Sequence, residues 1–147
     1  MGGCSSQTLG AFSDETRREI ENDTNILCVE QMHCLMICRK FRSHFFSSQW
    51  GRFHQTGSLA VTDQRLVFLA EGWHRGHKFS QMVDQPLTDE RWSRVTFAIH
   101  PPTPKTQTTV LVIQYDAGLF QPSWSGSMEL QFTTERAQEI LHRIRSK

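Results

Sequence analysis

Hydrophobic and polar residues alternate in short runs over most of the chain beyond Asn25, and this pattern predicts strands rather than helices. The expected strands lie over residues 26–29, 34–41, 57–62, 65–69, 77–83, 92–99, 109–115 and 127–132. The second run is apolar on both faces, which is typical of a strand that is covered on both sides. The clearest pairing is a hairpin in which the polar turn Asp63-Gln64 joins 57–62 to 65–69. Three longer connections are expected over residues 43–54, 71–76 and 116–126.

Two segments carry a helical pattern instead. The apolar face of the last segment is formed by Ala137, Ile140, Leu141 and Ile144. Either Thr133 or Thr134 is expected to cap this helix at its N-terminus. Near the start of the chain, residues 13–22 are expected to form a short helix with Ser13 as its N-cap, after a flexible stretch over residues 1–12.

The order of these elements predicts a mainly β fold with a C-terminal helix, in the α+β class. Strands that follow one another without intervening helices pair antiparallel, so about seven strands are expected to form a barrel or sandwich. The last helix would then close one end of it. We expect residues 1–24 to be a flexible tail with a short helix and residues 25–147 to be the folded domain.

Composition narrows the possible partners. The 147 residues suit one domain, and 16 Lys and Arg against 15 Asp and Glu give a net charge of +1. Nucleic-acid-binding domains usually carry a clear basic excess, so no nucleic-acid partner is expected. No apolar run approaches the roughly 18 residues of a membrane-spanning helix, and the start lacks an apolar signal segment. We therefore expect a cytoplasmic protein with reduced cysteines, whose oligomeric state the sequence leaves open.

The predicted hairpin resembles a known family. From Gly57 to Leu69 it reads GSLAVTDQRLVFL, similar to the Gly-x-hydrophobic-x-hydrophobic-Thr-x-x-Arg-hydrophobic-x-Phe pattern of GRAM domains, which belong to the pleckstrin-homology (PH) superfold. The likeness to the GRAM family of WW-domain-binding proteins extends to Asn25-Ile26-Leu27 and to Trp124-Ser125-Gly126-Ser127, and covers residues 24–147. The resemblance implies a PH-like barrel in which the connections after the first, third and sixth strands meet at the open end.

Each of these three connections contains a tryptophan, and basic residues lie around them. The candidate lipid- or partner-binding residues are Arg39, Lys40, Arg42, Phe45, Phe46, Trp50, Arg52, Trp73, Arg75, Lys78 and Trp124. Indole rings favour the membrane interface, and guanidinium and ammonium groups pair with lipid phosphates. The open end is therefore interpreted as a surface for anionic lipid headgroups such as phosphoinositides. The alternatives are a protein-binding surface and aromatic residues that simply pack the mouth of the barrel.

The start of the chain carries a lipidation motif. Met1-Gly2-Gly3-Cys4-Ser5-Ser6 matches the N-myristoylation pattern, with Gly2 as the acceptor once Met1 is removed. One myristoyl chain binds membranes only marginally, and residues 1–12 contain no Lys or Arg that would add a basic patch. Palmitoylation of Cys4 is the candidate second signal. The motif predicts an anchor at Gly2 and Cys4 that holds the chain to the cytosolic face of a membrane.

Other chemistry is not indicated by the sequence. Cys28, His33, Cys34 and Cys38 lie within eleven residues, but His33 and Cys34 would face opposite sides of a strand, so no zinc site is expected. The G-x-S-x-G, H-E-x-x-H and P-loop patterns are absent, so we expect neither an enzyme nor a cofactor. The leading hypothesis is a membrane-associated PH/GRAM-like binding module. The alternatives are a protein-interaction adaptor without lipid binding and, by the family resemblance, a transcriptional co-regulator adaptor.

Overall fold

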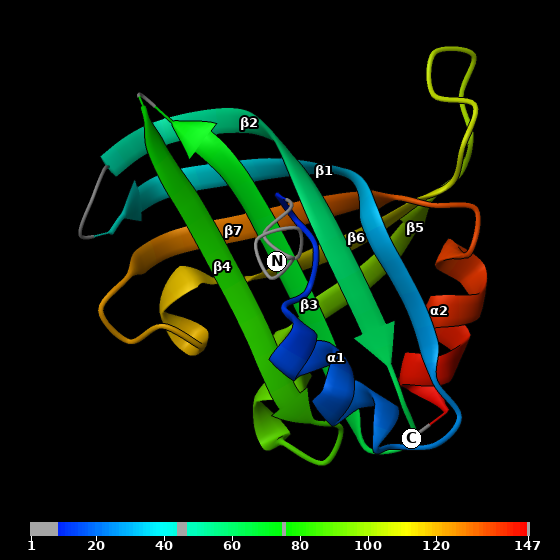
Figure 1. Cartoon of the computed structure of the whole chain (residues 1–147). Coiled ribbons are helices and arrows are strands. Elements are labelled where there is room, and N and C mark those ends of the chain that lie inside the picture. The colour runs from blue at the N-terminus through cyan, green and yellow to red at the C-terminus, as the bar shows by residue number, and fades with distance from the viewer. Residues whose placement is uncertain (1–8, 44–46, 75, 147) are drawn as a thin grey trace, which may run out of the picture.

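Seven antiparallel strands form one curved sheet in the computed structural model, which describes residues 9–43, 47–74 and 76–146 (Figure 1). The strands are β1 (Leu27–Arg42), β2 (Ser47–Val61), β3 (Arg65–His74), β4 (His77–Pro86), β5 (Thr96–His100), β6 (Val110–Asp116) and β7 (Ser125–Thr133). Their order across the sheet is β4-β3-β2-β1-β7-β6-β5. The predicted mainly β fold with a C-terminal helix is therefore confirmed.

Strand β1 joins the two halves of the sheet. It combines two runs that the sequence predicted as separate strands, and it pairs with β2 along one edge and with β7 along the other. A shift of register between Val29 and Met32 bends the strand, and Gln31 lies in the left-handed backbone region there. Bulges of this kind increase the local twist, which helps one strand to serve both halves of the curved sheet.

Strand β2 begins earlier than the sequence predicted. Residues 47–54 were expected to belong to a loop, but Ser47 pairs with Arg42, and the pairing continues along both strands. Most of the run is polar, and its two large apolar residues, Trp50 and Phe53, lie on opposite faces of the strand. A run whose apolar residues do not recur at every second position is not distinguishable from a loop by hydrophobic alternation. The prediction for these residues was wrong for that reason.

The predicted hairpin between β2 and β3 is confirmed. Val61 pairs with Leu66, and the turn residues join the two strands. The buried carboxylate of Asp23 accepts hydrogen bonds from Thr62 Oγ1 at 2.8 Å and from Arg65 Nε at 2.8 Å. The threonine and arginine of the GRAM-like pattern therefore hold the hairpin against the segment that precedes β1.

Helix α2 (Ala137–Arg145) closes one end of the curved sheet, as predicted. Ala137, Ile140 and Leu141 are buried on its inner face. Thr134 Oγ1 accepts a hydrogen bond from the backbone N–H of Arg136 at 3.1 Å, so this threonine stabilises the turn that leads into the helix. The N-cap position itself is Arg136, whose side chain makes no capping hydrogen bond, so the prediction of Thr133 or Thr134 as the N-cap was wrong.

The predicted strand over residues 92–99 is shorter in the structure. Its first part belongs to the 3₁₀ helix η2 (Glu90–Arg94), and β5 begins only at Thr96. Asp89 initiates η2, because its carboxylate accepts a hydrogen bond from Arg91 N at 2.9 Å. A second 3₁₀ helix, η3 (Ala117–Leu119), follows β6 directly. Both short helices flank strands of the β5–β7 half of the sheet, since η2 precedes β5 and η3 follows β6.

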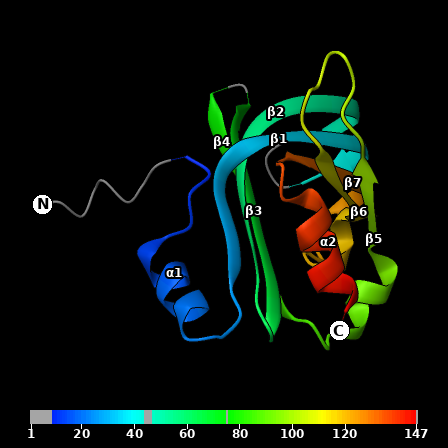
Figure 2. The same ribbon diagram turned by 90° about the vertical axis from the view of Figure 1, so that its right-hand side faces the viewer.

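Residues 9–23, which we call the strap, cover the outer face of β2 and β3. The strap contains helix α1 (Asp14–Glu21), whose N-cap is Ser13 as predicted. Figure 2 shows α1 and α2 on opposite sides of the β1–β4 half of the sheet. The apolar contacts of the strap form a second small core made of Phe12, Ile20, Ala60, Val67 and Leu69.

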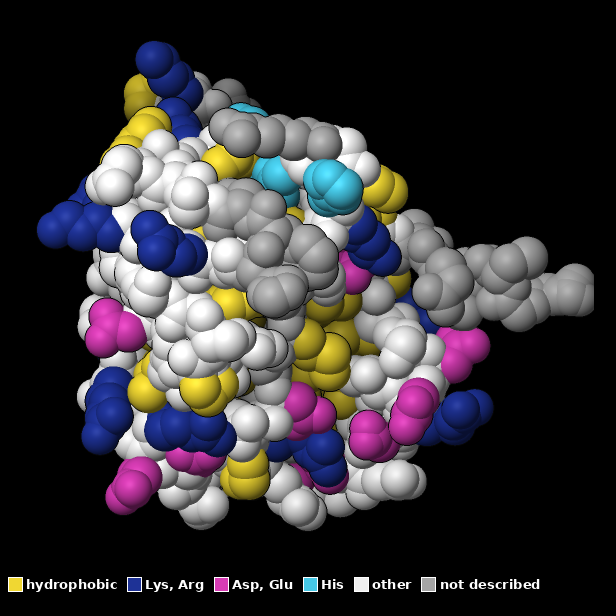
Figure 3. Space-filling view, turned by 90° about the vertical axis from the view of Figure 1, so that its left-hand side faces the viewer, with side chains coloured by type: hydrophobic (Ala, Val, Ile, Leu, Met, Phe, Trp, Pro, Cys, Tyr) yellow, Lys and Arg dark blue, Asp and Glu magenta, His cyan; other side chains and the backbone are white. Residues whose placement is uncertain are grey.

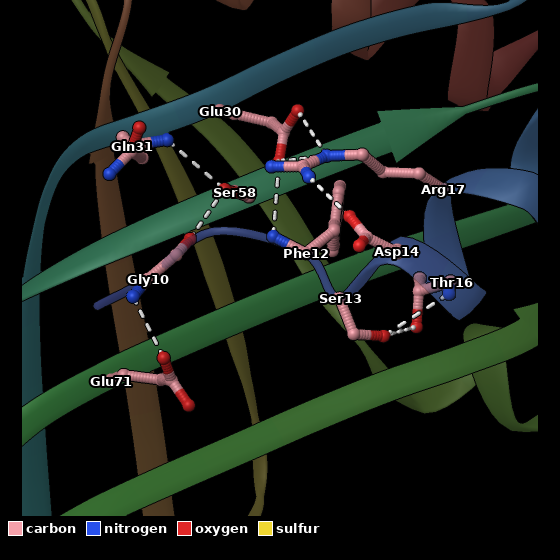
Figure 4. Close-up of polar contacts among 10 residues, drawn as sticks. All are labelled: Gly10, Phe12, Ser13, Asp14, Thr16, Arg17, Glu30, Gln31, Ser58 and Glu71. Carbon is pink, nitrogen blue, oxygen red and sulfur yellow. Dashed lines mark hydrogen bonds and ion pairs between the residues drawn. The ribbon is translucent and has the colours of Figure 1, made fainter. Parts of the chain in front are cut away.

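In addition to the contacts of Asp23, three residues of the strap, Gly10, Phe12 and Arg17, form polar contacts with the sheet (Figure 4). Gly10 N donates to Glu71 Oε1 at 2.7 Å, and Ser58 Oγ donates to the carbonyl oxygen of Gly10 at 2.5 Å. Phe12 N donates to Glu30 Oε1 at 3.0 Å, and Arg17 forms an ion pair with the same carboxylate. The sequence predicted a flexible stretch through residue 12, whereas its described part, residues 9–12, is held to the folded domain.

Candidate functional site

Three bends of the chain lie at the end of the molecule that is opposite α2 (Figure 1). They are the connections β1–β2, β3–β4 and β6–β7, the ones that the sequence analysis selected. Aromatic contacts connect them, because Trp124 stacks on Phe79 of β4 with ring centroids 5.3 Å apart and meets the edge of Phe41 of β1 at 5.5 Å. Figure 3 looks at this end, where Lys and Arg side chains are spread around the face and histidines lie near its upper edge.

The three tryptophans differ in exposure. Trp124 is half-buried and packs against the core, so it fills the mouth between β1 and β4. Trp50 and Trp73, by contrast, are 59% and 64% exposed. Both lie within strands rather than loops, Trp50 near the start of β2 and Trp73 near the end of β3. Only these two of the three indoles are available to a partner.

Trp50 and Trp73 both point to the outer face of the sheet. Trp50 is paired with exposed Arg39, whereas the neighbouring position on β2 is a buried glycine. Trp73 lies two positions beyond Glu71, whose carboxylate binds the strap on the outer face, and it is paired with Lys78. Successive side chains on a strand alternate between faces, so this spacing places both rings on the outside.

The basic residues at this end also fall into two groups. Lys78 forms an ion pair with Glu71 at 3.4 Å. Arg39, Lys40, Arg42 and Arg52 are exposed, and none of them forms an ion pair with a residue that the structure describes. These four cations, together with Trp50 and Trp73, form what we call the basic–aromatic surface. The other predicted site residues, Gly2, Cys4, Phe45, Phe46 and Arg75, lie outside the described residues.

Lys40 is placed by a bulge in β1. The register with β7 shifts between Arg39 and Arg42, and Lys40 has a φ of 51°, in the left-handed region. Gly126 on β7 faces this bulge with a φ of 97°, and a Cβ at that position would lie 2.7 Å from the carbonyl oxygen of Arg39. The glycine therefore lets β7 approach the bulge closely, and the bulge separates Lys40 from the regular alternation of the strand.

A groove beside the bulge contains two residues that the sequence analysis did not select, Arg94 and Asp116. Its volume is about 740 Å³, and it is open to solvent. It is lined by Arg39, Lys40, Arg94, Asp116, Gly118, Leu119, Trp124, Ser125, Gly126 and Ser127. The alternating pattern of residues 92–99 places Arg94 on the face opposite Val95, so the sequence does indicate that Arg94 is exposed. Its proximity to Arg39 depends on the pairing of β1, β7 and β6, which the sequence does not reveal.

Two acidic side chains near this groove have different environments. Glu129 accepts hydrogen bonds from the amide of Gln114 at 2.6 Å and from that of Gln131 at 2.5 Å, so both of its oxygens are engaged. The carboxylate of Asp116 has no hydrogen bond or ion pair with any side chain in the described ranges. Asp116 is therefore available to a ligand, whereas Glu129 stabilises the sheet.

Three titratable groups of β1, on Cys28, His33 and Cys34, have pKa values shifted by burial. His33 Nε2 lies 3.0 Å from His54 Nδ1 on the outer face, and burial together with the charge of His54 lowers the pKa of His33. Burial of the sulfur and the nearby Glu30 raise the pKa of Cys28 to about 11, and burial raises the pKa of Cys34 as well. These thiols are protonated at neutral pH. Within the described residues, no group of three or more His, Cys, Asp or Glu could hold a metal ion.

The fold and this surface define a mainly β domain with a basic and aromatic face on the outer side of the sheet, near the end opposite α2. Comparison with protein-family models, with curated proteins and with solved structures finds no match for the chain. In the part of the chain that the structure describes, no helix is both long and apolar enough to cross a bilayer.

Proposed function

We propose that this chain is a non-enzymatic module that binds anionic membranes through its basic–aromatic surface. The observation that carries the proposal is the exposure of Trp50 and Trp73 on one face, beside cations that have no acidic partner in the described residues. Indole rings favour the interfacial region of a bilayer, where their apolar body and polar N–H are both accommodated. Each Lys or Arg near an anionic surface adds about 1 kcal/mol of attraction, so the four cations and two indoles would act together.

The lipidation motif and the family resemblance belong to the same proposal. Acylation at Gly2 supplies one weak membrane signal, and the basic–aromatic surface supplies a second, with Cys4 as a further acylation site. The strap brings the chain to Gly10, which is held on Glu71, two positions from Trp73. The anchor and the exposed indole would then start from neighbouring points on the same face. The order of the strands and the position of α2 support a PH/GRAM-like domain.

A protein-interaction adaptor is the second candidate function. The outer strands β4 and β5 stand at the ends of the sheet order, so each has one edge without a strand partner among the described residues. Strand β4 contains 10 residues, which is long enough for an extended peptide to pair along it. An adaptor of this kind would not require Trp50 or Trp73 to contact lipid.

Vesicle co-sedimentation of the unlipidated full chain tests the proposal. We expect binding to phosphatidylcholine vesicles that contain phosphatidylglycerol, weak binding to pure phosphatidylcholine, and a loss of binding as salt rises. The double variant Trp50→Ala, Trp73→Ala should bind at least tenfold more weakly, which corresponds to about 1.4 kcal/mol. Ile26→Ala is the matched control, because Ile26 is an exposed hydrophobic residue on a different part of the surface. Absence of binding at low salt, or equal binding by the double variant, would contradict the proposal and favour the adaptor.

A further inference from the structure

The groove beside the bulge has a definite order of charges across the sheet. Arg39 on β1 is paired with Ser127 on β7, and Ser127 is paired with Asp116 at the end of β6. Arg94 follows on the next segment and lines the same groove. Along this row, Arg39 is positive, Ser127 carries a hydroxyl group, Asp116 is negative and Arg94 is positive. Lys40 adds a second positive charge at the Arg39 end.

These opposite charges lie side by side without pairing. Asp116 forms no ion pair with Arg39 or Arg94, although all three line one groove. In the adjacent turn, by contrast, Arg91 and Asp89 pair at 2.7 Å. The side chains of Arg39, Asp116 and Arg94 are exposed, so their hydrogen-bonding atoms are open to solvent. A ligand that carries both signs of charge could satisfy all of them together.

The complementary ligand has a negative, a positive and a negative group in sequence. We infer that the groove binds the headgroup of phosphatidylserine, in which a phosphodiester is followed by a carbon that carries both an ammonium and a carboxylate. The phosphodiester would pair with Arg39 and Lys40, the ammonium with Asp116, and the carboxylate with the guanidinium of Arg94, which suits bidentate pairing. Trp124 and Leu119 provide an apolar border for the glycerol end.

Asp116 is the residue that discriminates among anionic lipids. A glycerol or inositol headgroup carries no positive charge, so the carboxylate would repel its phosphate without a compensating ion pair. Neutralising Asp116 should therefore act in opposite directions on two lipids of equal net charge. This inference rests on the proposed function, because it names the lipid that the membrane-binding module selects.

The experiment compares vesicles that contain equal fractions of phosphatidylserine or phosphatidylglycerol in phosphatidylcholine. The wild-type chain should prefer phosphatidylserine by about threefold to fivefold, the effect of one exposed ion pair. Asp116→Asn should strengthen binding to phosphatidylglycerol and abolish the preference. Arg94→Gln should weaken binding to phosphatidylserine more than to phosphatidylglycerol. Glu129→Gln is the matched control: it removes the same charge next to the groove, and should strengthen binding to both lipids alike.

Equal binding of the wild type to both vesicles, or an equal effect of Asp116→Asn on both, would overturn the inference. It would leave the proposed function intact, because the basic–aromatic surface would still bind membranes. The opposite possibility is that the groove binds the headgroup although the chain does not bind membranes. It is tested with soluble glycerophosphoserine, by following the NMR chemical-shift changes of Ser127 and Asp116. The Trp50→Ala, Trp73→Ala variant should keep these shifts while losing vesicle binding. Shifts in a wild-type chain that itself binds no vesicles would refute membrane association and retain the groove as a headgroup site.

Discussion

At the scale of single residues, Lys40 combines backbone strain with an exposed charge. The left-handed region costs a non-glycine residue about 1 kcal/mol or more, and such strain is often found at functional positions. Lys40 has a φ of 51° at the bulge and lines the groove with its side chain. The strain is compatible with a residue that is retained for binding rather than for stability.

Lys40→Gly should therefore change stability and binding in opposite directions. Glycine adopts the left-handed region without strain, so the free energy of unfolding should rise by up to about 1 kcal/mol, offset in part by greater freedom in the unfolded chain. Binding to anionic vesicles should fall because a cation is lost. Lys40→Ala provides the comparison, since it loses the same charge but keeps the strain. Denaturant titration and co-sedimentation measure the two effects, and a Lys40→Gly variant less stable than Lys40→Ala would refute the argument.

Single residues also show which parts of the site the sequence could reveal. Trp50 and Trp73 were recognisable because exposed indoles and cations have a known preference for membrane interfaces. Trp124 was assigned to the same surface, but its ring packs on Phe79, a contact between β4 and the β6–β7 connection. Asp116 was not selected, because its significance depends on Arg94 and on a pairing register. The residue types could be recognised in the sequence, whereas their proximity in three dimensions could not be predicted from it.

At the scale of elements, the facing strands β1 and β2 carry a histidine pair whose environment predicts that folding depends on pH. His33 Nε2 and His54 Nδ1 are 3.0 Å apart, and the pKa of His33 is lowered in the folded state by burial and then by His54. A histidine with a lowered pKa takes up its proton more readily in the unfolded chain. Acidification below about pH 6.5 therefore favours unfolding. Burial lowers the pKa of His74 too, which acts in the same direction.

The free energy of unfolding should therefore be constant above about pH 7.5 and should fall as the pH drops through 6.5 toward 5. His33→Gln should reduce this decrease, because glutamine does not titrate but can still donate to His54. Denaturant titrations at a series of pH values measure the slope for each variant. His100→Gln, at the exposed end of β5, controls for the loss of one histidine elsewhere. An unchanged slope in His33→Gln would show that the pair does not sense pH.

Strand boundaries were predictable only where apolar residues recur at every second position along the strand. The hairpin of β2 and β3 was predictable because its apolar residues alternate on both sides of a polar turn. The first half of β2 was not predictable, since its large apolar residues, Trp50 and Phe53, lie on opposite faces and do not alternate with polar ones. Strand β5 was predicted too long because Asp89 starts a 3₁₀ turn, which alternation alone does not show. Local chemistry decided these boundaries after the hydrophobic pattern had suggested the elements.

At the scale of the whole molecule, the strap changes the division between tail and domain. Residues 1–12 are small and mostly uncharged, so the sequence favoured a flexible tail there. Phe12, Thr16 and Ile20 are nevertheless all buried and lie one turn apart, on a single face of the strap. The outer face of β3 carries buried Val67 and Leu69, which require a cover that no strand provides. The strap and the outer face therefore belong to one folded unit.

Phe12→Ala tests whether the strap is an integral part of the fold. The side chain is fully buried, and replacing a buried phenylalanine by alanine costs about 3–5 kcal/mol. We expect a loss near the lower end of that range, because the second core is small, with one cooperative transition in denaturant. Ile26→Ala is the control at an exposed position, with an expected change within about 0.5 kcal/mol. Vesicle binding by folded, unlipidated Phe12→Ala should match the wild type, since the basic–aromatic surface lies outside the strap. A loss of stability no larger than that of Ile26→Ala would mean that the strap detaches independently and that the domain begins at β1.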